Sequence, residues 1–250
     1  MRNETWDVVE SLDQYFPEDS ISADEVDIQK FIIALLKNGS FKNLDRMLDF
    51  GAGPTVHRMV PFAPYIKSID IAEYLPESMR AISAWIDGKK GSRNWDTYIQ
   101  KTLKLEGSAS DDRAVAKRRT LLKKKIRWLL SGDIRKPVPL GKKIHYPLVT
   151  SFYCADAITT SKKLWVTYMK NLSSLVTPGG WLIITTLRNT NYSLLGDHNM
   201  PNVRLVESDI ETIYKSLGYN MRTFKVKKIS AKMWSHVGVS DIMLAFAQKN

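Results

Sequence analysis

Leu48-Asp49-Phe50-Gly51-Ala52-Gly53-Pro54-Thr55 is the stretch of the chain that decides its fold, and Ile69-Asp70 follows it, with the acid 19 residues after Gly51. An apolar run leads into a glycine-rich turn, and a carboxylate stands at the end of the next apolar run. Glycines let the backbone approach a ligand closely, and an acid about 20 residues further on can accept hydrogen bonds from ribose hydroxyls. The pattern predicts a βα unit that binds a nucleoside-bearing cofactor.

The composition is that of one globular domain. The 250 residues are 44% hydrophobic and 25% charged, a balance typical of a soluble chain with a sizeable core. No apolar run reaches the roughly 20 residues of a membrane span, and the acidic N-terminus has no apolar stretch of a secretory signal. Cys154 is the single cysteine, which excludes an internal disulfide, and no HxxxH or CxxC spacing supports a metal site. We expect one cytoplasmic domain over residues 1–250, without membrane or metal, and the oligomeric state stays open.

Hydrophobic periodicity predicts alternating helices and strands. The expected helices are 5–16, 22–39, 76–88, 162–175 and 206–217, and the expected strands are 47–50, 66–70, 98–103, 146–153, 181–187, 224–229 and 242–247. Alternation of this kind implies a mostly parallel sheet with both faces covered, and the short link between the last two strands implies an antiparallel pair. The expected fold class is therefore α/β, with the Rossmann-like sheet of a class I S-adenosylmethionine methyltransferase.

Two segments are expected outside this sheet. Residues 1–40 are interpreted as N-terminal lid helices, and residues 104–143 as a helical insertion that closes over the carboxyl edge of the sheet. Residues 101–146 hold 14 Lys or Arg against four acids, so most of the net charge of +11 belongs to this segment. Val115, Leu122, Ile126 and Leu129 form one apolar stripe, which predicts an amphipathic basic helix.

Several motifs in order carry a resemblance to a known family. The chain resembles, over about residues 10–249, the nicotinamide, phenylethanolamine and thioether/indolethylamine N-methyltransferases through Asp49 to Thr55, Asn94-Trp95-Asp96, Gly132-Asp133, Asn171 to Gly180 and Tyr192-Ser193-Leu194-Leu195-Gly196. The resemblance implies S-adenosyl-L-methionine as cofactor and S-adenosyl-L-homocysteine as product. It also implies the cofactor-binding residues Tyr15, Asp49, Gly51, Gly53, Thr55, Asp70, Asp133, Ile134 and Ser151.

The resemblance implies separate roles for these residues. The glycine turn and Thr55 line the methionine end of the cofactor, and Ser151 lies near the same portion. Asp70 holds the ribose hydroxyls. Asp133, with Ile134 beside it, faces the adenine amino group, and Tyr15 belongs to a lid.

The acceptor side departs from the family pattern. An acid at the end of the fifth strand anchors the family's amine or amide substrates, whereas Thr186 stands at that place here and Thr190 replaces the following serine. Asp156 and Asp241 are candidates for orienting an acceptor, since both lie near expected carboxyl ends of strands, although either also fits a cap or a solvated turn. Tyr192, Trp234 and His236 are further candidates for lining the acceptor pocket. His57 is interpreted as structural.

The predicted function is methyl transfer to a small-molecule acceptor, at a nitrogen of an amine or azaheterocycle. The cofactor carries the activation in such an in-line displacement, so the protein mainly positions and desolvates the reactants. O- or S-methylation stays an alternative, as does a nucleic-acid methyltransferase that uses the basic segment. The latter is disfavoured, because Ser151-Phe152-Tyr153 stands where such enzymes carry Asn-Pro-Pro-Tyr. A binding protein that keeps the fold without turnover is the third class.

Overall fold

The computed structural model describes residues 7–39, 41 and 44–250, so the expected helix residues 5 and 6 and residue 40 of the expected lid lie outside the described residues. The helices are α1 Val8–Tyr15, α2 Ala23–Lys37, α3 Pro76–Ile86, α4 Asp96–Glu106, α5 Asp112–Lys125, α6 Lys162–Ser173 and α7 Glu207–Ser216. The strands are β1 Arg46–Phe50, β2 Ser68–Glu73, β3 Ile126–Ser131, β4 Tyr146–Phe152, β5 Val176–Leu187, β6 Tyr192–Leu195, β7 His198–Pro201, β8 Lys225–Ser230 and β9 Asp241–Gln248. Short 3-10 turns are η1 His57–Met59, η2 Asp156–Ile158 and η3 Lys232–Val237.

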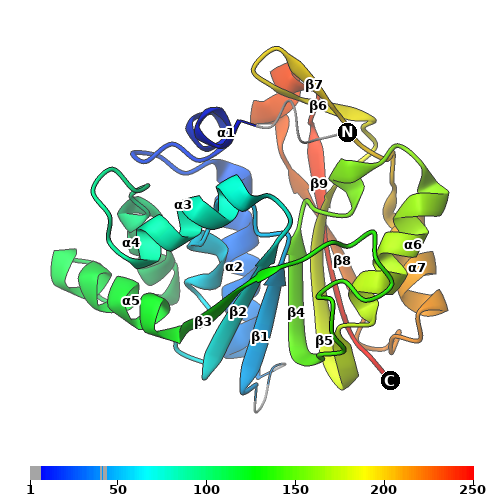
Figure 1. Ribbon diagram of the computed structural model, residues 1–250, viewed down its shortest axis with the longest axis horizontal. Helices are drawn as coiled ribbons and strands as arrows, with labels where there is room; N and C mark the ends of the chain where they lie inside the picture. Colours follow the sequence, from blue (N-terminus) through cyan, green and yellow to red (C-terminus); the bar gives the residue numbers. More distant parts are fainter. Residues whose placement is uncertain (1–6, 40, 42–43) are drawn as a thin grey trace.

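One seven-stranded sheet organises the molecule, in the order β3-β2-β1-β4-β5-β9-β8 (Figure 1). The pairs β3–β2, β2–β1, β1–β4 and β4–β5 are parallel, whereas β9 pairs antiparallel with both β5 and β8. The strand order reverses between β1 and β4, and in open α/β sheets a ligand binds at such a switch point, outside the carboxyl ends of the strands. The class I methyltransferase sheet predicted from the sequence is confirmed.

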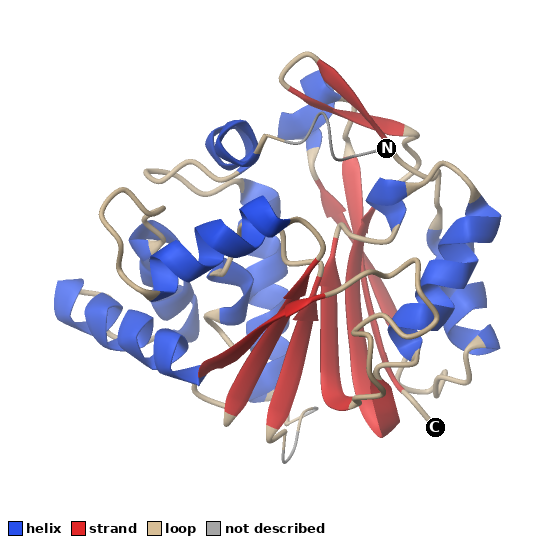
Figure 2. Cartoon of the chain, viewed as in Figure 1, coloured by secondary structure: helices blue, strands red, loops and turns tan. Residues whose placement is uncertain are grey.

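Side-chain alternation along the strands builds two cores, one on each face of the sheet. Met47 of β1 and Ile183 of β5 join the core under α2, α3, α4 and α5, whereas Leu48 and Leu182 join the core under α6 and α7. Figure 2 shows the two groups of helices on opposite sides of the strands. The near-continuous burial of β1, β4 and β5 follows from this double covering.

The expected strand over 98–103 is wrong, because these residues lie within α4. Tyr98, Ile99 and Leu103 share one buried helix face, and the helix ends at Gly107, whose φ of 76° is a left-handed conformation that glycine adopts easily. A short apolar run fits a strand and a buried helix face equally well, and here the helical spacing of the buried residues is what distinguishes the two.

The expected insertion over 104–143 is also wrong in part. It contains the end of α4, all of α5 and the strand β3, which pairs parallel with β2 and is therefore part of the sheet. The predicted apolar stripe is split, since Val115 and Leu122 lie on α5 but Ile126 and Leu129 lie on β3. In Figure 1, α5 lies beside α4, away from the carboxyl ends of the central strands.

Other segments cover the carboxyl edge of the sheet: α1, the β6–β7 hairpin and η3 lie above it in Figure 1. Of the predicted lid, α1 fits this position. Helix α2 is instead a core helix, since Ile28 and Ile32 are fully buried against the sheet. Within the described ranges, the structure holds no helix with the length and apolarity of a transmembrane segment.

The central strand β5 offers a test of the core. Ile183 is fully buried, so Ile183→Ala is expected to lower the free energy of unfolding by about 2–5 kcal/mol through lost burial and a residual cavity. Val166→Ala on the outer face of α6, where the side chain is 45% exposed, serves as the control and should change it by less than about 0.5 kcal/mol. Urea unfolding followed by circular dichroism measures both; equal losses would contradict the two-face core.

Candidate active site

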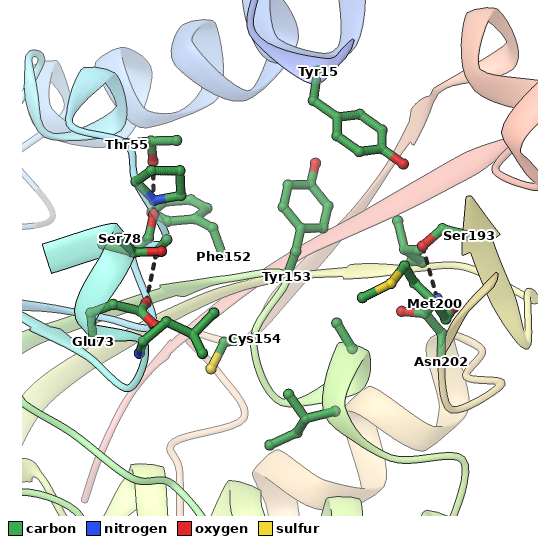
Figure 3. A pocket seen from close by; sticks show the side chains of 18 of the residues that line it. Tyr15, Thr55, Glu73, Ser78, Phe152, Tyr153, Cys154, Ser193, Met200 and Asn202 are labelled. Atoms are coloured by element: carbon green, nitrogen blue, oxygen red, sulfur yellow. Dashed lines mark hydrogen bonds between the residues drawn. The ribbon is translucent and has the colours of Figure 1, made fainter. Parts of the chain in front are cut away.

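A cavity of about 320 Å³ opens at the carboxyl ends of β1, β2 and β4 (Figure 3). Its wall is built by the turn after β1, the end of β2, the loops after β3 and β4, the start of α2 and the β6–β7 hairpin, with Tyr15, Leu187 and Trp234 also contributing. In Figure 3, Glu73 and Ser78 lie at one side of the pocket, Ser193 and Asn202 at the other, and Tyr153 between them. The predicted residues that line this cavity are Tyr15, Gly51, Gly53, Thr55, Asp133, Ile134 and Trp234.

The glycine turn after β1 brings backbone, rather than side chains, to the cavity. Gly51 and Gly53 have φ of 71° and 60°, in the left-handed region where a side chain costs roughly 1–2 kcal/mol. A Cβ on Gly51 would lie 2.4 Å from the sulfur of Cys154, so the turn also needs glycine to pack against the loop after β4. Thr55 fixes the end of the turn, since its hydroxyl donates to the carbonyl of Ala52 at 2.8 Å.

Glu73, the last residue of β2, connects the glycine turn to the next strand. One carboxylate oxygen accepts from Gly53 N at 2.8 Å, and the other accepts from Tyr74 N and Leu75 N at 2.8 and 2.9 Å. Backbone donors of this kind favour the ionised carboxylate. The result is an anionic group in the cavity wall, beside the backbone of the glycine turn.

Asp70, which the sequence predicts to hold the ribose hydroxyls, does not line the cavity. Asp70 is fully buried three residues earlier on β2, where Arg46 Nε donates to it at 3.0 Å and the Tyr146 hydroxyl donates at 2.9 Å. The apolar run does not end at Asp70 but continues through Ile71 and Ala72. Glu73 lies 20 residues after Gly53 and directly before the turn into α3. Its position at the end of the strand is the feature of the sequence that could have identified it as the acid of the cavity.

The loop after β3 forms the next part of the wall. Arg135 donates two hydrogen bonds to the carboxylate of Asp133, at 2.8 and 3.0 Å, and these bonds lower the pKa of Asp133. The guanidinium also lies 4.4 Å from the centre of the Tyr74 ring. Asn171 on α6 holds the loop, because its amide donates to the carbonyl of Ile134 at 2.9 Å.

Aromatic rings cover the opposite part of the cavity. Tyr15 donates its hydroxyl to the carbonyl of Leu194, and its ring centre lies 5.3 Å from that of Trp234. The indole N–H of Trp234 donates to Asp24 at 3.1 Å. Tyr153, at the end of β4, has φ of 52°, a left-handed conformation that is uncommon for an aromatic residue and occurs mainly where the surroundings enforce it.

A buried ion pair that the sequence did not reveal supports this aromatic wall. Glu25 on α2 accepts two hydrogen bonds from Arg58, at 3.0 and 2.8 Å. Burial alone would raise the pKa of Glu25, but Arg58 and His57 lower it to about 2. The Arg58 guanidinium lies 5.1–5.2 Å from the ring centres of Phe16, Phe152 and Tyr153, so its charge is enclosed by rings.

His57 fills the space behind the ion pair, as the structural interpretation expects. It is fully buried, lies 3.0 Å from Glu25 and stacks on Trp95 with ring centres 4.9 Å apart. Burial lowers its pKa despite the nearby carboxylate. A neutral, enclosed imidazole acts here as a packing group.

Three predicted residues gather in a different place. Ser151, Asp156 and Thr186 line a separate cavity of about 10 Å³ on the α6 face of the sheet, which has room for about one water molecule. Asp156 accepts a hydrogen bond from the backbone N–H of Leu187 at 2.8 Å, so it fixes the end of β5. Ser151, predicted to lie near the cofactor, and Asp156 and Thr186, predicted to meet the acceptor, therefore do not line the main cavity.

The remaining acceptor candidates also lie outside the main cavity. Thr190 donates to the carbonyls of Tyr192 and Gly238, both at 2.8 Å, and the exposed Tyr192 ring packs over Gly238. Asp241 lies 3.7 Å from Arg188 in a surface ion pair, and His236 is exposed beside Trp234. Thr190 and Tyr192 lie between β5 and α7, where the chain forms the β6–β7 hairpin that the sequence did not predict, and other residues of this segment, such as Ser193 and Met200, line the cavity instead.

Asp49 lies beneath the glycine turn rather than in the cavity wall. Its side chain is buried and accepts a hydrogen bond from the Thr150 hydroxyl at 2.7 Å. Burial raises the pKa of Asp49 to about 6. The carboxyl group therefore supports the β1–β4 junction from behind.

Metal ligands are not gathered in the part of the chain that the structure describes, where no three His, Cys, Asp or Glu side chains form a group that could hold an ion. The cavity instead combines exposed backbone at a glycine turn, a strand-end carboxylate and an aromatic wall. This combination fits an adenosyl group at one side and an organic molecule at the other.

Comparison with protein families agrees with this geometry. The family described as the NNMT/PNMT/TEMT family matches residues 3–250. The chain is 24% identical over 203 residues to nicotinamide N-methyltransferase of Homo sapiens, covering 80% of this chain and 76% of that enzyme. It is 23% identical over 208 residues to phenylethanolamine N-methyltransferase of Homo sapiens, covering 81% and 73%.

Solved structures share the fold. The N-methyltransferase NodS from Bradyrhizobium japonicum, in complex with S-adenosyl-L-homocysteine, superimposes with a TM-score of 0.53 at 12% identity, over 97% of this chain and 98% of that one. A methyltransferase from Methanosarcina mazei gives a TM-score of 0.56 at 10% identity, over 86% and 96%. At these low sequence identities, the structural similarity shows that the fold is shared.

The buried carboxyl of Asp49 predicts a pH effect on stability. Its pKa is raised from 3.8 to about 6, so above pH 4 the unfolded chain releases this proton before the folded one does. The ionisation of Asp49 therefore lowers the free energy of unfolding progressively as the pH rises from about 4 to 6, and it lowers it no further above pH 6. Asp49→Asn keeps an oxygen for Thr150 but cannot ionise. The variant should gain stability relative to the native chain between pH 4 and 7 in urea titrations. A difference independent of pH would contradict the assignment, and Asp45→Asn, which removes an exposed carboxyl, is the control.

Proposed function

Since this chain belongs to the NNMT/PNMT/TEMT family and is an S-adenosylmethionine-dependent methyltransferase, we propose that it methylates a nitrogen of a small-molecule amine or azaheterocycle. The observation that carries the proposal is the cavity in which the glycine turn and Glu73 adjoin an aromatic wall. A small organic acceptor fits the enclosed, largely apolar space opposite the glycine turn.

The residues around the glycine turn fit the cofactor. We assign Glu73 to the ribose hydroxyls, Asp133 and Ile134 to the adenine, and Gly51 and Gly53 to the methionine end. The fit rests on the backbone of Gly51 and Gly53 in the cavity wall, where a Cβ on Gly53 would meet open space, and on the carboxylate held at the end of β2. The bound cofactor supplies an electrophilic methyl group on a sulfonium.

The protein's own contribution is to orient the acceptor and to exclude water. Tyr15, Trp234 and Tyr153 present ring faces that hold an organic molecule against the cofactor side of the cavity. The hydrogen bond from Tyr15 to the β6–β7 hairpin closes the cavity from above. Positioning of this kind lowers the barrier without a covalent step on the protein.

Three cations of the basic segment are engaged within the protein rather than available to a nucleic acid. Arg118 is bonded to Glu106 at 2.9 and 2.7 Å, Arg119 is bonded to Asp96, and Lys123 lies 4.8 Å from the centre of the Trp85 ring. These cations stabilise the packing of α5 on its neighbours. A phosphate-binding surface would need them facing solvent.

A methyl-transfer screen tests the function. Labelled S-adenosylmethionine is incubated with amines, azaheterocycles, phenols, thiols and transfer RNA, and we expect label in one or more nitrogen compounds. Transfer only to oxygen, sulfur or RNA would contradict the proposal. Binding of S-adenosylhomocysteine without any transfer would favour a protein that keeps the fold without turnover.

Two matched substitutions on β2 test the cofactor assignment. Glu73→Gln should weaken the calorimetric affinity for S-adenosylhomocysteine by about tenfold to a hundredfold, because charge-assisted hydrogen bonds to the ribose are lost. Asp70→Asn should leave this affinity within about twofold and mainly lower the free energy of unfolding, since Asp70 bonds only to Arg46 and Tyr146 among the described residues. The reverse ranking of the two affinities would overturn the assignment.

A further inference from the structure

The cavity is acidic although the protein is basic. Four acids line it, Asp24, Glu25, Glu73 and Asp133, against two arginines, Arg58 and Arg135, so the ionised wall has a net charge of −2 within a chain of +11. A concave site lined by one sign of charge raises the local concentration of oppositely charged ligands. The wall therefore favours a cationic molecule.

Three of the four carboxylates already have strong partners. Glu25 is paired with Arg58, and Asp133 with Arg135. Glu73 accepts three backbone N–H groups. Arg58 and Arg135 neutralise Glu25 and Asp133, and the backbone donors hold Glu73 at the side assigned to the ribose, so none of the three provides a site for a cationic acceptor.

Asp24 is different. Asp24 is only 5% exposed, and it lines the cavity. In the described part of the chain, no cationic side chain lies within ion-pair distance of its carboxylate, in contrast to Glu25. It accepts a hydrogen bond from the neutral indole of Trp234 at 3.1 Å, and burial raises its pKa, with Ser22 and Trp234 opposing and Glu25 adding to the rise. A buried carboxylate without a counter-ion is costly unless a ligand supplies the charge.

Aromatic rings surround this carboxylate on the cavity side. Trp234, which donates to Asp24, packs against Tyr15, and both line the cavity. Ring faces attract an ammonium group through their negative quadrupole, and the attraction grows when water is excluded. A carboxylate and two rings together form the usual chemistry of an ammonium site.

We propose that Asp24, Trp234 and Tyr15 form a subsite for the nitrogen of the acceptor, which binds as an ammonium cation; the acceptor is then an alkylamine with an apolar body rather than a neutral azaheterocycle. Before methyl transfer this nitrogen gives one proton to the Asp24 carboxylate, which frees the lone pair that accepts the methyl group, and Asp24 then releases the proton to solvent. This inference rests on the proposed N-methylation and names its substrate class. The acid comes from the first turn of α2, far along the chain from β5, where Thr186 points to a separate cavity.

Calorimetry with defined probes tests the subsite. The probes are phenethylamine, its neutral counterpart 2-phenylethanol, the permanent cation trimethylphenethylammonium and nicotinamide, each titrated into protein saturated with S-adenosylhomocysteine. The native protein should bind both cations at least about tenfold more tightly than either neutral probe. Asp24→Asn keeps an oxygen for the Trp234 N–H, and it should remove this preference while leaving the affinity for 2-phenylethanol within about twofold.

The matched control lies on the same helix. Asp27 is exposed and paired with Lys30 at 3.0 Å, so Asp27→Asn removes the same charge outside the cavity and should keep the preference for cations. If the native protein does not bind S-adenosylhomocysteine, the proposed function itself is rejected. With that binding intact, the subsite is overturned if the native protein shows no preference for the cations, or if Asp24→Asn and Asp27→Asn change the preference equally.

Discussion

The carboxylate of Glu73 is the interaction on which the rest of the site depends. It joins Gly53, in the turn after β1, to Tyr74 and Leu75, in the turn after β2, and so sets the spacing between two adjacent strand ends. A glycine turn is conformationally free on its own, and the hydrogen bonds that both turns donate to one carboxylate remove that freedom. The cavity wall beside the glycine turn is therefore held before any ligand arrives, which lowers the entropy that binding must overcome.

The sequence predicted the sheet well, because most of its strands are short apolar runs separated by glycine, proline or amphipathic helices. The prediction failed where the composition of a short apolar run fits a strand and a helix equally well. Tyr98 to Leu103 has the length of a strand, and only the helical spacing of its buried residues shows that it belongs to α4. The strand β3 was missed for a different reason. It is an edge strand with exposed residues, so it lacks the apolar run of a buried strand, and it follows directly on a basic helix whose pattern it continues.

The site was predictable only where it is local in sequence. Gly51 and Gly53 lie in one turn and follow from the glycine pattern, and Thr55 follows from the resemblance to the family. The distance from the turn indicated Asp70, but the acid that lines the cavity is Glu73, because β2 continues through the buried Ile71 and Ala72. Pairs such as Glu25–Arg58 and Asp24–Trp234 join residues 33 and 210 positions apart, and no pattern along the chain shows that such residues meet.

The roof of the cavity joins the two ends of the chain. Gln14 donates to the carbonyl of Leu194 at 2.8 Å and accepts from the N–H of Gly196 at 2.7 Å, next to the bond from Tyr15. By contrast, the glycine turn, Glu73 and Asp133 all precede residue 140. During synthesis on the ribosome, the segments that carry the glycine turn, Glu73 and Asp133 therefore emerge first, whereas the roof has to wait until the hairpin has emerged. A nascent chain thus gains the means to enclose an acceptor only near the end of its translation.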